Sequence, residues 1–303
     1  MTSWKTRAAM GTLKSILPFK PQLRQLKRNI FPYETNPKND PGLLDQSLRQ
    51  VGALAGLGIS VKGKTIVELG TGWLPILPLI YRMAGAARVI TVDQERLIDQ
   101  HTFANAIRSI HQGFDREIKN TGVDPGLFDR TCLPAATGDL RSLCEQAHIE
   151  LKSPFDFNDM PTDSCDIVTS RTVLEHISEN GLQRIFRSTK RILRTDGVMC
   201  HTIDMSDHGE HLDKSISRVN FLKYEPWVWR LACADPQLYQ NRLRRFEYEN
   251  MLHELGFDIL LMTGKPDAGA LKALAEMSLC GRYKGVRLED LAILDATIIA
   301  KVH

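Results

Sequence analysis

The sequence predicts an α/β protein with a doubly wound sheet, and three observations carry that prediction. A buried strand over residues 65–69 runs directly into a tight turn that contains Gly70 and Gly72. Segments with strand and helix periodicity then alternate along the chain, as they do in folds with a parallel sheet. A second strand, over residues 88–92, is followed at once by an acid, Asp93. Because parallel strands present their carboxyl ends at one edge of the sheet, we expect a ligand site along that edge.

The turn after the first strand has the features of a ligand cradle. Gly70 and Gly72 allow a sharp change of direction and let a ligand approach without a Cβ atom in the way. A helix over residues 74–83 should follow, with its first amides directed at that ligand. Glu68 lies near the carboxyl end of the buried strand, where an unpaired charge is unfavourable. A cationic or hydroxyl-bearing ligand would supply the partner that this carboxylate needs.

Two motifs, in this order, resemble the class I S-adenosylmethionine (SAM)-dependent methyltransferases. The string E-L-G-T-G at residues 68–72 resembles motif I of that family, E/D-x-G-x-G. The string D-I-V-T-S-R-T-V-L-E-H-I at residues 166–177 resembles its strand-four motif. A dinucleotide fingerprint would need a glycine at the sixth position, where this chain has Pro75. The resemblance covers about residues 60–303 and implies a seven-stranded, mostly parallel sheet that binds SAM as its cofactor.

The remaining elements are predicted from periodicity and from turn residues. Apolar stripes at helical spacing indicate helices, which span residues 41–57, 76–84, 179–193, 246–255 and 270–277, with a largely helical insertion over residues 97–150. Short apolar runs that follow turn residues indicate strands, which span residues 65–69, 88–93, 151–156, 165–170, 198–203, 257–262 and 294–302. The resemblance implies that the last strand lies antiparallel between strands five and six.

The residues that contact the cofactor follow from the resemblance and from residue type. Glu68 would meet the methionine end of SAM, with Gly70 and Gly72 passing close to it. Asp93, 25 positions after Glu68, would accept hydrogen bonds from both ribose hydroxyls; capping of the segment that follows is its alternative role. Asp156, or Asp159 in its place, would meet the adenine amino group.

Two residues at the end of the fourth strand complete the expected cofactor site. In the family pattern, Ser170 and Arg171 would reach the cofactor at the carboxyl edge of the sheet. Glu175 and His176, just beyond them, would pack against the following helix or cap it rather than act in catalysis.

The loop after the fifth strand, residues 204–213, faces the expected substrate pocket. His208 is the best candidate for a general base, because imidazole titrates near neutrality, and His211 is the second candidate. Two alternatives remain open: a metal site with these histidines and nearby acids as ligands, and a polar loop that only shapes the pocket. The spacing matches no established ligand pattern, so no metal is predicted.

Residues 205–245 form an insertion that the resemblance identifies as a substrate lid. Its aromatic side chains suit a flat or sugar-like acceptor, and its arginines suit a carboxylate or a phosphate. An oligomer interface or plain core packing is the alternative use of the same residues. The predicted organisation is therefore a helical N-terminal arm over residues 1–60 and a SAM-binding domain over residues 61–303.

Composition limits the partners and the compartment. A net charge of +3 gives no support for nucleic acid as the partner. Six cysteines without a C-x-x-C pair indicate reduced thiols in a cytoplasmic protein. Basic residues outnumber acids in residues 1–40. These residues are expected to form an arm packed on the domain with its basic face in water, and contact with an anionic membrane or a phosphorylated substrate is the alternative.

The sequence therefore predicts a methyltransferase that transfers the methyl group of SAM to an oxygen or nitrogen atom of a small molecule. A sugar of a polysaccharide precursor or a secondary metabolite is the expected acceptor. The alternatives are a nicotinamide-dependent oxidoreductase, which Pro75 and the final strand argue against, and an RNA methyltransferase. An RNA enzyme should carry a stronger basic field.

Overall fold

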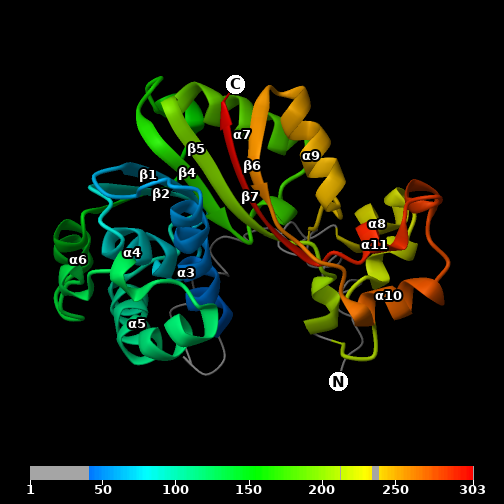
Figure 1. Cartoon of the computed structure of the whole chain (residues 1–303), viewed down its shortest axis with the longest axis horizontal. Helices are drawn as coiled ribbons and strands as arrows, with labels where there is room; N and C mark the ends of the chain where they lie inside the picture. The colour runs from blue at the N-terminus through cyan, green and yellow to red at the C-terminus, as the bar shows by residue number, and fades with distance from the viewer. Residues whose placement is uncertain (1–40, 212, 234–238, 303) are drawn as a thin grey trace, which may run out of the picture.

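The structure is a computed structural model that describes residues 41–211, 213–233 and 239–302. Its centre is a seven-stranded sheet in the order β3-β2-β1-β4-β5-β7-β6 (Figure 1). β7 runs antiparallel to β5 and to β6, whereas the other neighbours are parallel. The predicted doubly wound, mostly parallel sheet is thereby confirmed. The part of the expected N-terminal arm at residues 1–40 lies outside the described residues.

The bounds of the elements agree with the predicted order. The strands are β1 (Thr65–Leu69), β2 (Arg88–Val92), β3 (Ile149–Lys152), β4 (Cys165–Arg171), β5 (Leu193–Asp204), β6 (Phe257–Met262) and β7 (Asp295–Val302). The helices are α3 (Pro41–Gly56), α4 (Ile76–Met83), α5 (Gln100–Thr121), α6 (Leu140–Ala147), α7 (Glu179–Ile192), α8 (Pro226–Ala232), α9 (Arg245–Glu254), α10 (Ala268–Ala275) and α11 (Leu288–Leu291).

Two strand boundaries differ from the prediction. The third strand was expected over residues 151–156, but β3 spans Ile149–Lys152. His148, in the left-handed conformation, ends α6 and leads directly into β3, and Pro154 cannot continue the ladder because it has no N–H. β5 begins at Leu193 rather than at residue 198, because its first residue pairs with Cys165 before a bulge in β4.

Helices cover both faces of the sheet. Apolar side chains of α3, α4 and α5 pack on one face, where Ile66, Val89 and Ile299 belong to the same core cluster. Those of α7 and α9 pack on the other face, with Val67 and Ile298. Neighbouring residues of one strand thus enter opposite cores, as the alternation of a strand requires. Figure 1 shows the two helical layers on either side of the strands.

The ends of the helices follow from local signals in the sequence. Asp99 caps α5 by accepting a hydrogen bond from the Thr102 amide at 2.8 Å, and Gly122 ends that helix in the left-handed conformation. Ser178 caps α7 by accepting from the Gly181 amide. None of the helices in the described ranges is long and apolar enough to cross a membrane.

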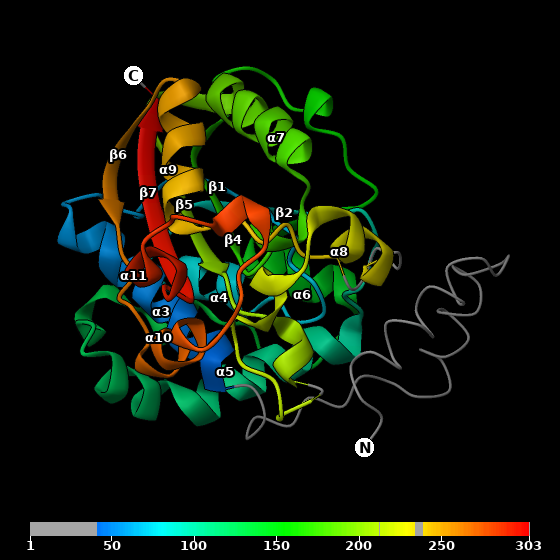
Figure 2. The same cartoon turned by 90° about the vertical axis from the view of Figure 1, so that its right-hand side faces the viewer.

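A third core lies beyond the ends of β5 and β6. It joins the expected insertion, through Phe221, Leu222 and Trp229, to residues 270–294 near the end of the chain. With the lobe turned toward the reader, α8, α10 and α11 lie together in front of the sheet (Figure 2). The insertion therefore forms part of a small lobe whose other half comes from the segment before β7.

Arg244 attaches this lobe to the sheet. Its side chain is fully buried and donates hydrogen bonds to three carbonyls: Met205 just after β5, Leu291 in α11 and Ile293 just before β7. Burial lowers the pKa of this guanidinium to about 10. Hydrogen bonds to a charged group contribute more than those between neutral groups, so one side chain fixes the end of β5 and the start of β7 together.

Replacing Arg244 by Met should therefore destabilise the protein by about 3 kcal/mol, because three buried carbonyls lose their donor. Urea unfolding followed by circular dichroism measures this change. The matched control is Arg230→Met, since Arg230 is exposed on α8. Equal unfolding midpoints for the Arg244 variant and the wild type would contradict this role.

Candidate functional site

The turn after β1 has a backbone conformation and a close side-chain contact that only glycine permits. Gly70 and Gly72 both have positive φ, +67° and +69°. A Cβ atom at Gly70 would lie 2.7 Å from the Val173 side chain, whereas the corresponding space at Gly72 is open. The turn is therefore packed on one side and open on the other, as a cradle for a ligand must be.

Glu68 is buried beneath this turn, with an exposed fraction of 3%. The Thr71 hydroxyl donates to its carboxylate at 2.5 Å. Burial raises the pKa of Glu68 to about 8, because desolvation outweighs the hydrogen bond from Thr71 and the attraction of Arg171. These contacts thus offset only part of the free-energy cost of burying Glu68. A cationic ligand bound at the turn would offset more of it.

Asp93 lies next to Glu68 at the tip of the adjacent strand. Its carboxylate accepts hydrogen bonds from the Gly72 amide at 3.2 Å and the Gln94 amide at 2.7 Å. Asp93 therefore also has the structural role named as its alternative, because its carboxylate holds the start of the loop after β2. The Glu95 amide also donates to this carboxylate, at 3.4 Å. A carboxylate has about four acceptor positions, so one remains for the ribose, on the oxygen that accepts from Gly72.

A cavity of about 840 Å³ extends from the glycine turn toward α7. Gly70, Asp93 and Asp156 line it together, which brings three of the predicted cofactor residues to one space. The Asp156 carboxylate also accepts a hydrogen bond from the Asn158 amide at 2.9 Å. Phe155 and Phe157 on either side of it meet edge to face, with ring centroids 5.3 Å apart, and add apolar walls.

Ser170 and Arg171 lie at the end of β4, as predicted, but they face different surroundings. The Ser170 side chain is fully buried, and its hydroxyl lies 2.8 Å from Nδ1 of His201 inside the core. The Arg171 guanidinium donates to Gln46 of α3 at 3.1 Å. Arg171 is also close enough to Glu68 to attract its carboxylate, whereas the Ser170 hydroxyl contacts β5.

The loop after β5 brings an acid and a histidine together. The Asp204 carboxylate lies 3.3 Å from Nε2 of His208 and accepts from the Ser206 amide at 2.8 Å. Burial alone would raise the pKa of Asp204, but the contacts with His208 and Ser206 hold it at about 2. His211 is exposed, and its ring centroid is 5.5 Å from that of His208.

Residues after β4 join this group, which the sequence did not predict. The ring of His176 lies 5.1 Å from that of His208, and Glu175 is buried beside them. Asp204, four positions before His208, offered a local signal in its spacing. Glu175 and His176 offered none, because more than thirty residues separate them from His208 in the chain.

Comparison with known proteins agrees with this geometry. A family model described as "Methyltransferase domain" matches residues 43–261. This chain belongs to that methyltransferase family. The protein is accordingly a SAM-dependent methyltransferase, and no curated protein sequence matches it.

Solved structures resemble this methyltransferase at low sequence identity and with TM-scores below 0.5. One is a SAM-dependent methyltransferase from Mesorhizobium loti, with 14% identity, a TM-score of 0.42, and coverage of 82% of this chain and 95% of that one. Another is magnesium protoporphyrin IX methyltransferase from Synechocystis PCC 6803 with bound SAH, with 12% identity, a TM-score of 0.47, and coverage of 94% and 95%.

The residues at the glycine turn fit SAM. The cofactor carries a sulfonium and an ammonium group, and Glu68 is a buried carboxylate whose own contacts leave it under-compensated. The cavity beside it has the size of a small-molecule site. We propose that Glu68 meets the methionine end, that Asp93 holds the ribose, and that Asp156 and the two phenylalanines meet the adenine.

Replacing Asp93 by Ala should weaken SAM binding several-fold, because the ribose hydroxyls lose their acceptor. Isothermal titration calorimetry measures the affinity. Asp115→Ala, on the exposed side of α5, is the matched control. Unchanged SAM affinity in the Asp93 variant would remove that residue from the cofactor site.

Glu68→Gln should change how stability depends on pH. The folded protein keeps on Glu68 a proton that the unfolded chain loses near the ordinary glutamate pKa of 4.5, so its stability falls as pH rises from 4.5 to about 8. Gln retains the acceptor for Thr71 but does not titrate. The free energy of unfolding of the variant should therefore exceed that of the wild type by up to a few kcal/mol as pH rises from 4.5 to about 8. Its affinity for SAM should fall. The measurement is the melting temperature of each protein as a function of pH. If the two melting temperatures change with pH in the same way, Glu68 is not a buried group that titrates.

Proposed function

We propose that this methyltransferase transfers the methyl group of SAM to a hydroxyl oxygen or an amine nitrogen of a polyhydroxylated small molecule. A sugar unit of a polysaccharide precursor is the acceptor class that fits best, and a hydroxylated secondary metabolite is the other member of that class. The observation that carries the proposal is a groove with charged and hydroxyl side chains on both walls, which reaches the same sheet edge as the Asp204–His208 pair.

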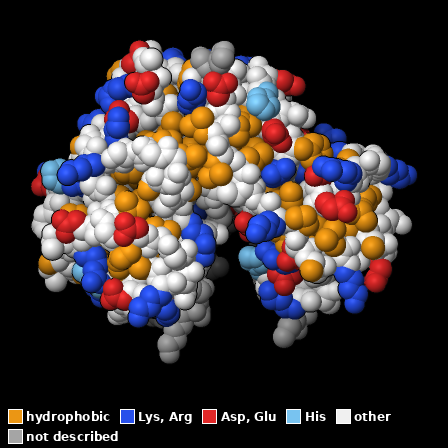
Figure 3. Space-filling view, viewed as in Figure 1, with side chains coloured by type: hydrophobic (Ala, Val, Ile, Leu, Met, Phe, Trp, Pro, Cys, Tyr) orange, Lys and Arg blue, Asp and Glu red, His pale blue; other side chains and the backbone are white. Residues whose placement is uncertain are grey.

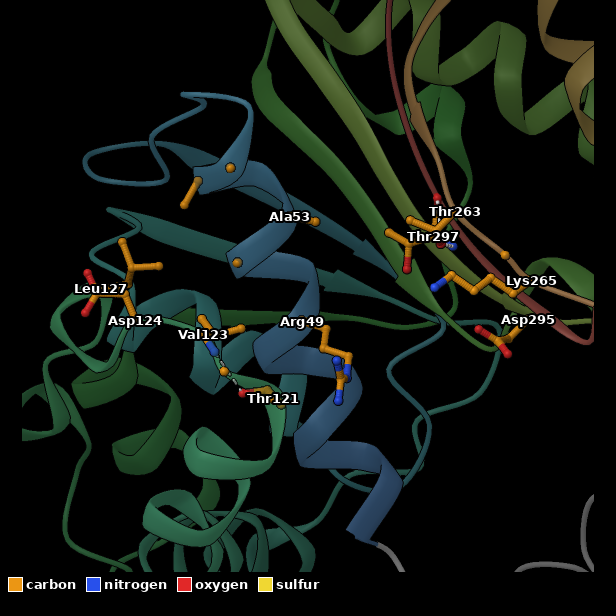
Figure 4. A pocket seen from close by; sticks show the side chains of 15 residues that line it. Arg49, Ala53, Thr121, Val123, Asp124, Leu127, Thr263, Lys265, Asp295 and Thr297 are labelled. Carbon is orange, nitrogen blue, oxygen red and sulfur yellow. Dashed lines mark hydrogen bonds between the residues drawn. The ribbon is translucent and has the colours of Figure 1, made fainter.

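The groove lies between α3 and the ends of β6 and β7, and its volume is about 910 Å³. Arg49 extends from α3, and Lys265, Thr297 and Asp295 lie opposite it (Figure 4). In the space-filling view a hollow separates the α3–α5 layer from the lobe of α8, α10 and α11 (Figure 3). Charged and hydroxyl side chains on both walls suit an acceptor with many hydroxyl groups.

Asp295 connects the groove to the loop after β5. It pairs with Asp204 across β5 and β7, so the two acids are direct neighbours at the sheet edge. Burial and the nearby Asp204 raise the pKa of Asp295 above its usual range. An acceptor in the groove that reached past Asp295 would therefore arrive at Asp204 and His208.

Methyl transfer from SAM is an in-line displacement at an activated carbon. The protein has to hold the acceptor atom in line with the methyl–sulfur bond, and it has to exclude water. A hydroxyl acceptor must also lose its proton. We assign the activation of that hydroxyl to His208, which Asp204 holds in place, and we give His211 at most a secondary part because its ring is exposed.

The proposal is tested by incubating the enzyme with methyl-labelled SAM and a panel of nucleotide-activated sugars, simple hydroxylated metabolites and total RNA. We expect label to enter one of the small-molecule pools. Label that entered RNA, or that entered none of the small-molecule pools, would contradict the proposed acceptor class.

With the acceptor so identified, His208→Ala should lower kcat by about a hundredfold or more and leave SAM affinity nearly unchanged. His111→Ala, exposed on α5, is the control. Steady-state kinetics and calorimetry separate the two effects. Loss of SAM binding in the His208 variant would place this residue in the cofactor site instead.

A further inference from the structure

We propose that Glu175, His176 and His208 bind a divalent transition-metal ion, at the edge of the sheet where the acceptor is expected. The inference deepens the proposed function, on which it rests for the position of the acceptor. It specifies how His208 would act there, namely as a ligand of an ion that binds the acceptor oxygen.

The three side chains have the spacing of a metal site. One ligand atom from each of them lies within 4.8 Å of the ligand atoms of the other two. Glu175 and His176 follow β4, and His208 follows β5, so two neighbouring parallel strands deliver them to one point. The three ligands thus converge from two segments that are far apart in the chain, at the carboxyl edge of the sheet, where ligand sites of such folds lie.

Glu175 provides the strongest reason to place a cation here. Its exposed fraction is 2%, and neither of its carboxylate oxygens has a hydrogen-bond partner within the described residues. A buried carboxylate without a partner is strongly unfavourable. A cation held between Glu175 and the two imidazoles would supply the missing interaction.

The contacts of the two imidazoles leave a lone pair on each ring for the ion. Nδ1 of His176 lies 2.8 Å from the Tyr239 carbonyl, which can only accept, so Nδ1 carries the proton and Nε2 is free to bind. Nε2 of His208 lies 3.3 Å from the Asp204 carboxylate, which leaves the lone pair of Nδ1. Histidines that bind metals usually have such a carbonyl or carboxylate at the other nitrogen.

The donor set points to a class of ion. Two imidazole nitrogens and one carboxylate favour Zn²⁺, Mn²⁺, Fe²⁺ or Co²⁺ over Mg²⁺ and Ca²⁺, which prefer oxygen ligands. Three protein ligands leave further positions for water or substrate. His176 is exposed and His208 is partly exposed, so those positions face the solvent side of the sheet edge.

An ion at this point would serve methyl transfer. Binding to the ion lowers the pKa of an acceptor hydroxyl, which then gives its proton to solvent. The oxygen lone pair forms the new carbon–oxygen bond as the methyl–sulfur bond breaks, and the sulfur leaves as the neutral thioether of the demethylated cofactor. A catalytic pair of Asp204 and His208 would need neither His176 nor the buried Glu175, whereas the metal site uses both.

The test uses the full-length protein, freed of metal with a chelator, and Co²⁺ as the probe. Calorimetry measures the affinity, and the visible d–d absorption bands report nitrogen ligands and geometry. We expect the wild type to bind one ion with such bands. Glu175→Gln and His176→Ala should each weaken binding by at least about tenfold. His253→Ala, on the exposed surface of α9, should bind Co²⁺ like the wild type.

Two results would overturn the proposal: a metal-free wild type that takes up neither Co²⁺ nor Zn²⁺, or variants that bind Co²⁺ as the wild type does. Retained SAM affinity shows that each variant is folded, since Glu175 and His176 lie outside the cofactor cradle. Metal binding is measured without SAM or acceptor, so its failure leaves the proposed acceptor class standing. Failure of the acceptor screen would likewise leave the metal site standing.

Discussion

The parallel register of β1 with β2 and β4 is the constraint on which this enzyme depends. It sets Glu68 opposite Thr91 and Thr169, and it brings the residues just beyond β1 and β2 to one edge of the sheet. The glycine turn and Asp93 are linked by a hydrogen bond there. The parallel pairing of β4 with β5 extends the same edge to Asp204. The proposed cofactor site and the proposed acceptor site therefore lie along one edge of the same sheet.

Several carboxyl groups along this edge are buried with too few hydrogen bonds and counter-charges to offset their desolvation. Burial raises the pKa values of Glu68 and Glu175, and Asp295 follows the same direction. Their desolvation lowers the stability of the protein without ligands, and oppositely charged ligands would recover part of that free energy on binding. Arg244 differs from these acids, since the two terminal nitrogens of its buried guanidinium donate to three carbonyls and fix the lobe.

The sequence predicted the fold, the glycine turn after β1 and the place of Asp93 beside it, because all three rest on short, contiguous signals. The E-x-G-x-G string and the acid after the second strand needed no knowledge of distant contacts. The third strand was misplaced by two to four residues, since its short apolar run gives no clear boundary. Ser170 was expected to face the cofactor, but the alternation of β4 turns its hydroxyl toward His201. The grouping of Glu175, His176 and His208 depends on the pairing of β4 with β5, which no local pattern contains.

A structure of the protein with SAM bound tests the central claim most directly. We expect the nucleoside to lie over the turn at Gly70 and Gly72, with its ribose hydroxyls on Asp93 and its sulfonium end toward Glu68 and the loop after β5. A nucleoside bound away from this turn, or a ribose without contact to Asp93, would contradict that claim.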